Sequence, residues 1–144
     1  MSTDVRVETT VDRPRSDVAA YMFDPHHDAA WTTGVVSCRP LTDGRLRTGS
    51  RVERTVSFLG RKFSYTYEVT AHDGDRFVEM LVTQPFPMHV RYELDDDGAN
   101  RTRVAIHAKG DATGFFRFAA PFMNGMVRKN IARDLEQLKR ELAR

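Results

Sequence analysis

The feature that most constrains the fold is a single long helical pattern at the C-terminal end of the chain. An apolar stripe recurs there at the spacing of one helix face, through Ile131, Leu135, Leu138 and Leu142. Upstream of this stripe, residues 115–127 are apolar on nearly every side. We therefore predict a helix over residues 114–144. Its second half packs on the protein by one face, and its first half is buried all round or borders an apolar group that is not protein.

Seven shorter runs come before this helix, and each alternates between apolar and polar residues. A period of two is typical of a strand with one buried face. The runs cover residues 3–12, 35–41, 50–59, 62–69, 78–82, 88–94 and 102–108. Turns such as Gly60 and the segment 73–75 separate consecutive runs, which predicts an antiparallel meander. Between the first two runs, we expect one short helix through Val18 and a second around Trp31 that Gly34 closes.

The predicted sheet has one apolar face, and the C-terminal helix is the element long enough to cover it. We therefore predict an α+β fold in which a seven-stranded curved antiparallel sheet grips a long C-terminal helix, with two short helices between strands 1 and 2. The chain has 144 residues and shows neither a linker nor a repeat, so we expect a single domain over residues 1–144.

Composition and motifs argue against several classes of protein. The net charge of +2 is too small to argue for nucleic-acid binding. Cys38 is the only cysteine, so we expect neither a disulfide nor a cysteine–histidine metal site. No apolar run approaches about twenty residues, which argues against a membrane-spanning segment and, with the polar N-terminus, for a cytoplasmic protein. Histidine pairs with metal-ligand spacing and nucleophile or phosphate-loop motifs are absent from the sequence, so we assign no catalytic residue, metal or cofactor.

The inward face of the predicted sheet is rich in aromatic residues and methionines, which suit an adaptable apolar pocket. Either these side chains fill an ordinary core or, together with the apolar half of the helix, they surround a cavity. The inward tyrosines favour a cavity, because buried hydroxyls need hydrogen-bond partners. The predicted ligand-binding residues are Trp31, Arg54, Phe58, Tyr65, Tyr67, Met80, Tyr92, Phe118, Phe122 and Met126.

Arg54 is the most informative residue of this set. Its strand phase, shared with Val52 and Val56, directs it toward the helix. A buried arginine without a partner is costly, and Glu68 in the neighbouring strand is out of phase. One interpretation is a cation that holds the anionic or carbonyl head of an apolar ligand. The alternatives are that Arg54 reaches water from a strand end or that a β-bulge shifts the phase. Trp31 also has two interpretations, a gate at the cavity mouth or an anchor for its short helix.

A diffuse pattern accompanies this order of elements along most of the chain. It consists of Arg13–Pro14 after the first strand, Asp24–Pro25, Trp31, Gly34–Val35, a basic strand at Gly49–Arg54 and a charged leucine repeat at 134–139. In these features the chain resembles the START-like helix-grip superfamily, also termed SRPBCC, which includes polyketide cyclase/dehydrase-like and lipid-transfer-like proteins. The resemblance implies an apolar cavity between the sheet and the long helix. It does not choose among the carriers, cyclases and regulators that share the fold.

Three functions are consistent with these features. The first is binding or transport of a hydrophobic small molecule, lipid or polyketide-like, in the predicted cavity. The second is a cyclase or aromatase in which Arg54 and a tyrosine polarise a substrate or transfer protons. The third is an interaction module that docks the start of the helix, with Phe115 and Phe116, on a protein or a membrane surface. The expected partner is the small-molecule ligand, and the sequence leaves open whether the protein also forms a weak homodimer.

Overall fold

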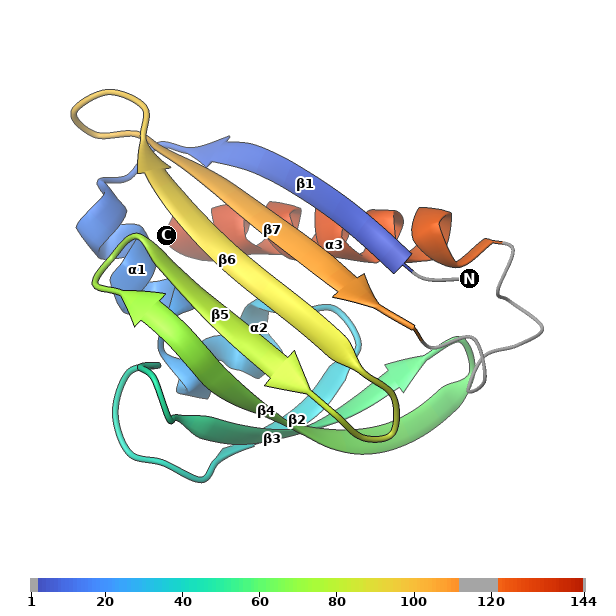
Figure 1. The fold of residues 1–144 in the computed structure, drawn as a ribbon. Coiled ribbons are helices and arrows are strands. Elements are labelled where there is room, and N and C mark those ends of the chain that lie inside the picture. Colours follow the sequence, from blue (N-terminus) through green and yellow to red (C-terminus); the bar gives the residue numbers. More distant parts are fainter. Residues whose placement is uncertain (1–2, 112–121, 144) are drawn as a thin grey trace.

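The computed structural model describes residues 3–111 and 122–143. In this part of the chain, one curved sheet carries all the helices on its inner side (Figure 1). The elements are β1 (Thr3–Val11), α1 (Arg15–Met22), the 3₁₀ helix η1 (Pro25–His27), α2 (Asp28–Trp31), β2 (Val35–Pro40), β3 (Arg51–Phe58), β4 (Arg61–Asp73), β5 (Phe77–Val82), β6 (Met88–Asp96), β7 (Thr102–Gly110) and α3 (Met123–Leu142). The order of elements is the one that the sequence predicts.

The strands form a 7-stranded antiparallel sheet in the order β1-β7-β6-β5-β4-β3-β2. Consecutive strands pair from β2 to β7, and β7 then pairs with β1. Because β1 and β2 lie at opposite edges, the connection between them has to pass across the concave face. This connection contains α1, η1 and α2, and it brings α2 into contact with both β2 and α3. The predicted fold is confirmed.

Two tight turns help to set the register at the β2 edge of the sheet. Gly34 follows α2 with a φ of +87°, and a Cβ atom there would lie 2.8 Å from a carbonyl oxygen of β3, so only glycine fits. Leu59 and Gly60 both have positive φ, as a two-residue hairpin turn between β3 and β4 requires. The resulting register places Arg54 of β3 opposite Tyr65 of β4.

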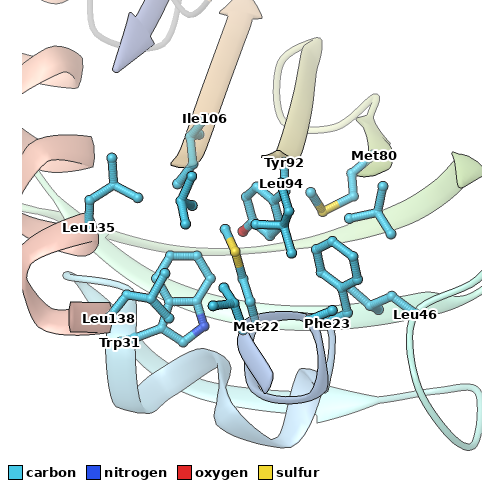
Figure 2. Packing of buried hydrophobic residues seen from close by; sticks show 14 of the residues in the cluster. Met22, Phe23, Trp31, Leu46, Met80, Tyr92, Leu94, Ile106, Leu135 and Leu138 are labelled. Atoms are coloured by element: carbon cyan, nitrogen blue, oxygen red, sulfur yellow. The ribbon is translucent and has the colours of Figure 1, made fainter. Parts of the chain in front are cut away.

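The space under the sheet is filled by side chains at the end that α1 and α2 cover (Figure 2). Large buried side chains among them come from the short helices, the strands and α3, and include Met22, Phe23, Trp31, Tyr67, Met80, Tyr92, Leu94, Leu135 and Leu138. The strand residues among them have the phase that the alternation predicts. We call this region the filled core.

The predicted stripe of α3 is confirmed. Ile131, Leu135 and Leu138 are buried, and Leu142 is partly buried against the same core. The described helix begins at Met123, whereas we predicted a helix from residue 114. The predictions for Phe115, Phe116 and Phe118 lie outside the described residues.

Phe122 comes directly before α3 and is 65% exposed. We predicted that its side chain would point inward, and the structure corrects this. Phe122 is the N-cap residue, so its backbone lies outside the helical geometry that begins at Met123. Its side chain therefore does not follow the helical phase that turns Met123 toward the sheet. None of the described helices combines the length and the apolar character that crossing a membrane requires.

Candidate ligand-binding site

A cavity of about 200 Å³ lies between the sheet and the first turns of α3. Its apolar wall comes mainly from β3, β4, β6 and α3, through Val56, Phe58, Phe63, Phe86, Met88, Met123 and Val127. Its polar lining includes Arg54, Tyr65, Tyr92 and Asp134. Because Tyr92 belongs both to the filled core and to the cavity wall, the two regions adjoin.

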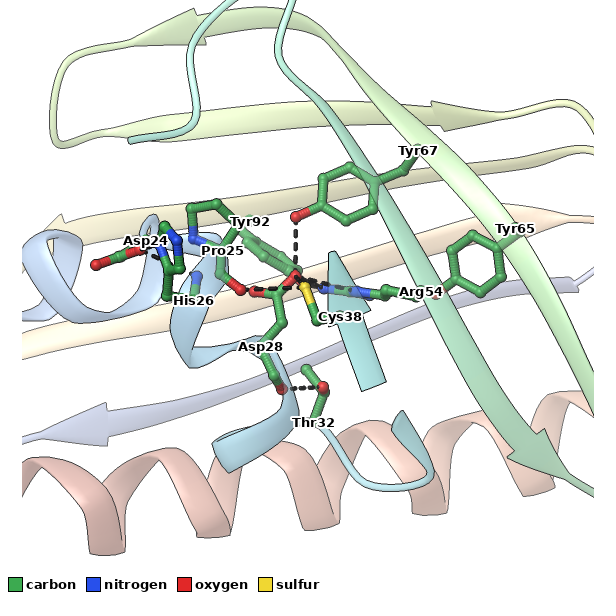
Figure 3. A network of polar contacts seen from close by, with 10 residues as sticks. All are labelled: Asp24, Pro25, His26, Asp28, Thr32, Cys38, Arg54, Tyr65, Tyr67 and Tyr92. Atoms are coloured by element: carbon green, nitrogen blue, oxygen red, sulfur yellow. Dashed lines mark hydrogen bonds and ion pairs between the residues drawn. The ribbon is translucent and has the colours of Figure 1, made fainter. Parts of the chain in front are cut away.

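Arg54 forms a buried ion pair with Asp28 of α2 (Figure 3). Its Nη2 and Nε atoms donate hydrogen bonds to Oδ2 of Asp28 at 2.8 and 3.1 Å. Asp28 is 0% exposed and Arg54 is 8% exposed. Arg54 therefore faces inward as its strand phase predicts, and the two alternatives, a water-exposed strand end and a shifted phase, are wrong. Its partner belongs to the helical connection and not to a neighbouring strand.

Three tyrosine hydroxyls complete this polar cluster (Figure 3). Tyr67 donates to Oδ2 of Asp28 at 2.9 Å, and the Cζ atom of Arg54 lies 4.7 Å from the centroid of the Tyr67 ring. The hydroxyls of Tyr65 and Tyr92 accept hydrogen bonds from Nη1 and Nη2 of Arg54, at 3.2 and 3.3 Å. Tyr65 and Tyr92 line the cavity, whereas Tyr67 is part of the filled core.

The surroundings of the cluster determine its charge state. Burial opposes the charge of Arg54, but the Asp28 carboxylate and the tyrosine oxygens outweigh burial and raise the pKa of Arg54 above its ordinary value. Burial also raises the pKa of Tyr67 and Tyr92, and the guanidinium offsets this effect only in part. At neutral pH the arginine is therefore charged and both phenols are protonated.

Cys38 of β2 contacts the same cluster. Its thiol donates to the carbonyl oxygen of Pro25 at 3.1 Å and lies 3.7 Å from Oδ2 of Asp28. Burial, followed by the nearby Asp28 carboxylate, raises the pKa of the thiol to about 12. A thiol with this pKa stays protonated at neutral pH, so Cys38 is a hydrogen-bond donor and not a nucleophile.

Asp134 brings a second carboxyl to the cavity, from the side of α3. It is 8% exposed and accepts a hydrogen bond from the backbone N–H of Thr33, in the loop between α2 and β2. Burial raises the pKa of Asp134 to about 6, and the hydrogen bonds from Thr33 and the charge of Arg54 offset only part of that effect. Asp134 thus ties the loop to α3 and places a titratable group in the cavity wall.

The predicted ligand-binding residues separate into groups in the structure. Those that line the cavity are Arg54, Phe58, Tyr65 and Tyr92. Those that belong to the filled core are Trp31, Tyr67 and Met80. On α3, Met126 is partly buried and the adjacent Val127 lines the cavity, because residues 123, 127 and 131 continue the buried stripe and residue 126 lies about 100° away from it. Phe122 is exposed, and Phe118 lies outside the described residues.

Trp31 anchors its helix to the core. The indole is 1% exposed and meets the ring of Tyr92 edge to face, with the ring centroids 5.5 Å apart. This contact supports the anchor interpretation of Trp31 over the gate interpretation.

Two carboxylates of the site were not predicted from the sequence. Strand periodicity could not identify Asp28, because this residue lies 26 positions from Arg54 and belongs to the helical connection, not to a strand. Asp134 could have been found, since it falls between Ile131 and Leu138 on the stripe of α3, where a charged residue is out of pattern. Within residues 3–111 and 122–143, no three histidine, cysteine, aspartate or glutamate side chains gather in a way that could hold a metal ion.

The sequence matches one family model over almost its whole length. The model is described as polyketide cyclase/dehydrase and lipid transport, and it covers residues 2–143. No curated protein sequence matches the chain significantly.

Solved structures share the fold at low sequence identity. The Zhui aromatase/cyclase of Streptomyces sp. R1128 is similar with a TM-score of 0.83 and 18% identity, over 100% of this chain and 95% of that one. A Thermus thermophilus protein has a TM-score of 0.81 and 16% identity, over 97% of each chain. A START superfamily protein of Mycobacterium smegmatis has a TM-score of 0.80 and 13% identity, again over 97% of each. Identities this low show the fold alone.

Proposed function

The chain belongs to the polyketide cyclase/dehydrase and lipid transport family, and from this premise we propose that it binds a hydrophobic small molecule between its sheet and α3. The observation that carries this proposal is the cavity of about 200 Å³, whose wall is mostly aromatic and aliphatic. Ligand sites typically combine such a wall with a few polar groups that orient the ligand. Arg54, Tyr65, Tyr92 and Asp134 are polar groups of this kind.

The volume of the cavity limits what fits in it. An engineered apolar cavity of about 150 Å³ takes up benzene. A cavity of about 200 Å³ therefore suits a substituted single ring or a short chain, or one such portion of a longer ligand. A long lipid would have to extend beyond the described walls.

Native mass spectrometry of protein purified from cells tests the proposal. We expect a bound apolar molecule that is released on denaturation. Val127→Phe should abolish the adduct, because it places a large ring inside the cavity. The matched control is Val36→Phe, which adds the same ring on β2 at a position that is 55% exposed. A wild-type protein that is ligand-free and takes up no added single-ring hydrocarbon would contradict the proposal.

A cyclase-type enzyme is the second candidate, and one observation favours it. Asp134 lines the same cavity as Tyr65 and Tyr92, and its pKa of about 6 suits proton transfer near neutral pH. An aromatase/cyclase is among the proteins that share the fold. In this reaction Asp134 would exchange a proton with the substrate, and the tyrosine hydroxyls would hold a carbonyl oxygen.

Incubation with a linear poly-β-ketone tests this second candidate. The enzyme should close a ring with loss of water faster than the spontaneous reaction does. Asp134→Asn should slow ring closure while the substrate still binds, whereas Glu136→Gln, an exposed carboxyl on the same helix, should leave the rate unchanged. A product pattern and rate equal to those without protein would exclude the activity for this substrate class.

A further inference from the structure

Resting on the proposed binding function, we infer that the cavity selects a neutral ligand with a carbonyl-type oxygen, held by the hydroxyls of Tyr65 and Tyr92, and rejects carboxylates. Ketones, esters and amides belong to this ligand class. The sequence leaves an anionic and a carbonyl head equally open for Arg54. The contacts around the guanidinium decide between them.

The first step is the balance of charge at Arg54. Its Nε and Nη2 atoms both bond to Asp28, and the two side chains are almost completely withdrawn from water. An internal carboxylate thus already compensates the cation. A ligand carboxylate would gain little from Arg54 and would still have to give up its own hydration, which is a large free-energy cost.

The second step is the supply of hydrogen-bond donors. The hydroxyls of Tyr65 and Tyr92 each accept a hydrogen bond from Arg54, so each has its own hydrogen left to donate. Among residues 3–111 and 122–143, the structure shows no acceptor for either hydrogen. Both residues line the cavity, and the adjacent guanidinium strengthens a phenol as a donor. A ligand oxygen that only accepts hydrogen bonds complements them.

The third step is the second carboxyl. Asp134 lines the same cavity and accepts its hydrogen bonds from Thr33. Lys109 and Asp111 also line the cavity and carry opposite charges, and Asp28 balances Arg54. When Asp134 is ionised, the described lining together with Asp28 therefore carries one net negative charge. This excess disfavours a bound anion and leaves a neutral ligand unaffected.

Tyr67 supplies a control that is built into the same cluster. Its hydroxyl donates to Asp28 and is therefore already used, and its ring lies in the filled core and not in the cavity wall. Tyr67→Phe, Tyr65→Phe and Tyr92→Phe each remove one hydroxyl from the cluster. Only the last two remove a donor that faces the cavity.

The test compares cumene, acetophenone and benzoate, which have one ring and equal numbers of non-hydrogen atoms but differ in the head group. Their affinities are measured by NMR titration of the protein at pH 7.5. Wild type should bind acetophenone about fivefold to tenfold more tightly than cumene, as one or two net hydrogen bonds provide. Benzoate should bind at least about tenfold more weakly than acetophenone. The carbonyl stretch of bound acetophenone should shift to lower frequency, a signature that needs no variant.

The variants assign the effect to particular hydroxyls. In Tyr65→Phe and Tyr92→Phe, the preference for acetophenone over cumene should shrink to about twofold or less, while cumene affinity changes little. Tyr67→Phe should keep the wild-type preference. An equal loss in Tyr67→Phe and in the two cavity variants would overturn the inference.

The ligand series also separates this inference from the proposed function. Binding of all three ligands with equal affinity, or tightest binding of benzoate, would leave the binding function standing and overturn the selectivity. An unshifted carbonyl stretch in bound acetophenone would do the same. If none of the three binds, both the proposed function and the inference fall.

Discussion

The two ends of the space under the sheet are built from similar residues but are packed differently. At the end covered by α1 and α2, Trp31, Leu135 and their neighbours pack against one another (Figure 2). The pocket at this end is an open surface groove between α2 and α3, bordered by the exposed side chains of Lys129, Arg133 and Arg140. At the end beside the first turns of α3, aromatic and methionine side chains surround a cavity of about 200 Å³. Apolar composition therefore does not distinguish core from binding site in this fold. The number of elements that converge on each end does, because α1 and α2 cover only one of them.

The boundary between the two ends is polar. Asp28, Arg54 and three tyrosine hydroxyls lie where the filled core meets the cavity. The filled core excludes water from the Asp28–Arg54 ion pair, and the hydroxyls of Tyr65 and Tyr92 face the cavity. A binding site of this kind depends on the core behind it, so changes at the boundary should have the largest effects.

Removing the carboxylate at the boundary should have the largest effect on stability. Asp28→Ala leaves the buried guanidinium without its counter-ion, and we expect the free energy of unfolding to fall by about 3–5 kcal/mol. Urea denaturation measures this change. Glu53→Ala is the matched control, since it breaks an exposed ion pair with Arg39 on the same sheet and should cost less than about 1 kcal/mol.

The double variant Asp28→Leu with Arg54→Met shows whether the loss comes from the uncompensated charge. Apolar residues of similar size can replace a buried ion pair without loss of stability. The double variant should therefore recover at least half of the loss seen in Asp28→Ala. A double variant that is less stable than Asp28→Ala would contradict the assignment.

The titration of Asp134 should make the cavity end sensitive to pH. Its pKa is raised from 3.8 to about 6 in the folded state, so the folded protein binds a proton more tightly than the unfolded chain. The stabilisation from that proton is present below about pH 4 and is lost as the pH rises to about 6. The loss is as much as about 3 kcal/mol for a shift of about two pH units.

Asp134→Asn removes this titration and keeps an oxygen for the N–H of Thr33. We expect the variant to be more stable than wild type at pH 7.5. At pH 4 this gain in unfolding free energy should be smaller or absent. Urea denaturation across this range gives the difference between the two proteins, in which the titration of other carboxyls cancels. Glu136→Gln, which is exposed on α3, should show no such pH-dependent difference. If the difference in unfolding free energy between Asp134→Asn and wild type does not change with pH, the assignment is contradicted.

Two valines on β3 allow the same valine-to-alanine substitution to be compared at the filled end and at the cavity end. Val52 is 1% exposed in the filled core, and Val56 is 8% exposed and lines the cavity. Val52→Ala removes methyl groups from a packed site and should cost about 2–3 kcal/mol, whereas Val56→Ala only enlarges an existing space and should cost about 1 kcal/mol. Equal losses in denaturation experiments would mean that the cavity end is as well packed as the core.

The sequence predicts more of the fold than of the site, and the residues show why. The alternation of β3 gives the inward direction of Arg54, and the spacing of Ile131, Leu135 and Leu138 gives the buried face of α3, because both follow from local periodicity. Asp28 meets Arg54 only after the chain has crossed from one edge of the sheet to the other. Periodicity carries no information about such a contact. For the same reason it could not separate the inward residue Tyr67, which is in the core, from Tyr65, which lines the cavity.

The smallest expected effect comes from adding volume at the same two positions. Val56→Ile places one more methylene group in open space, so it should leave stability unchanged or raise it by up to about 1 kcal/mol. Val52→Ile inserts the same group into a packed region and should lower stability by about 1 kcal/mol, because the neighbouring side chains have to move. Thermal and urea denaturation of both variants measure the difference in sign. If Val56→Ile is destabilised as much as Val52→Ile, the space beside Val56 is not available to a ligand either, and the distinction between a filled and an open end fails.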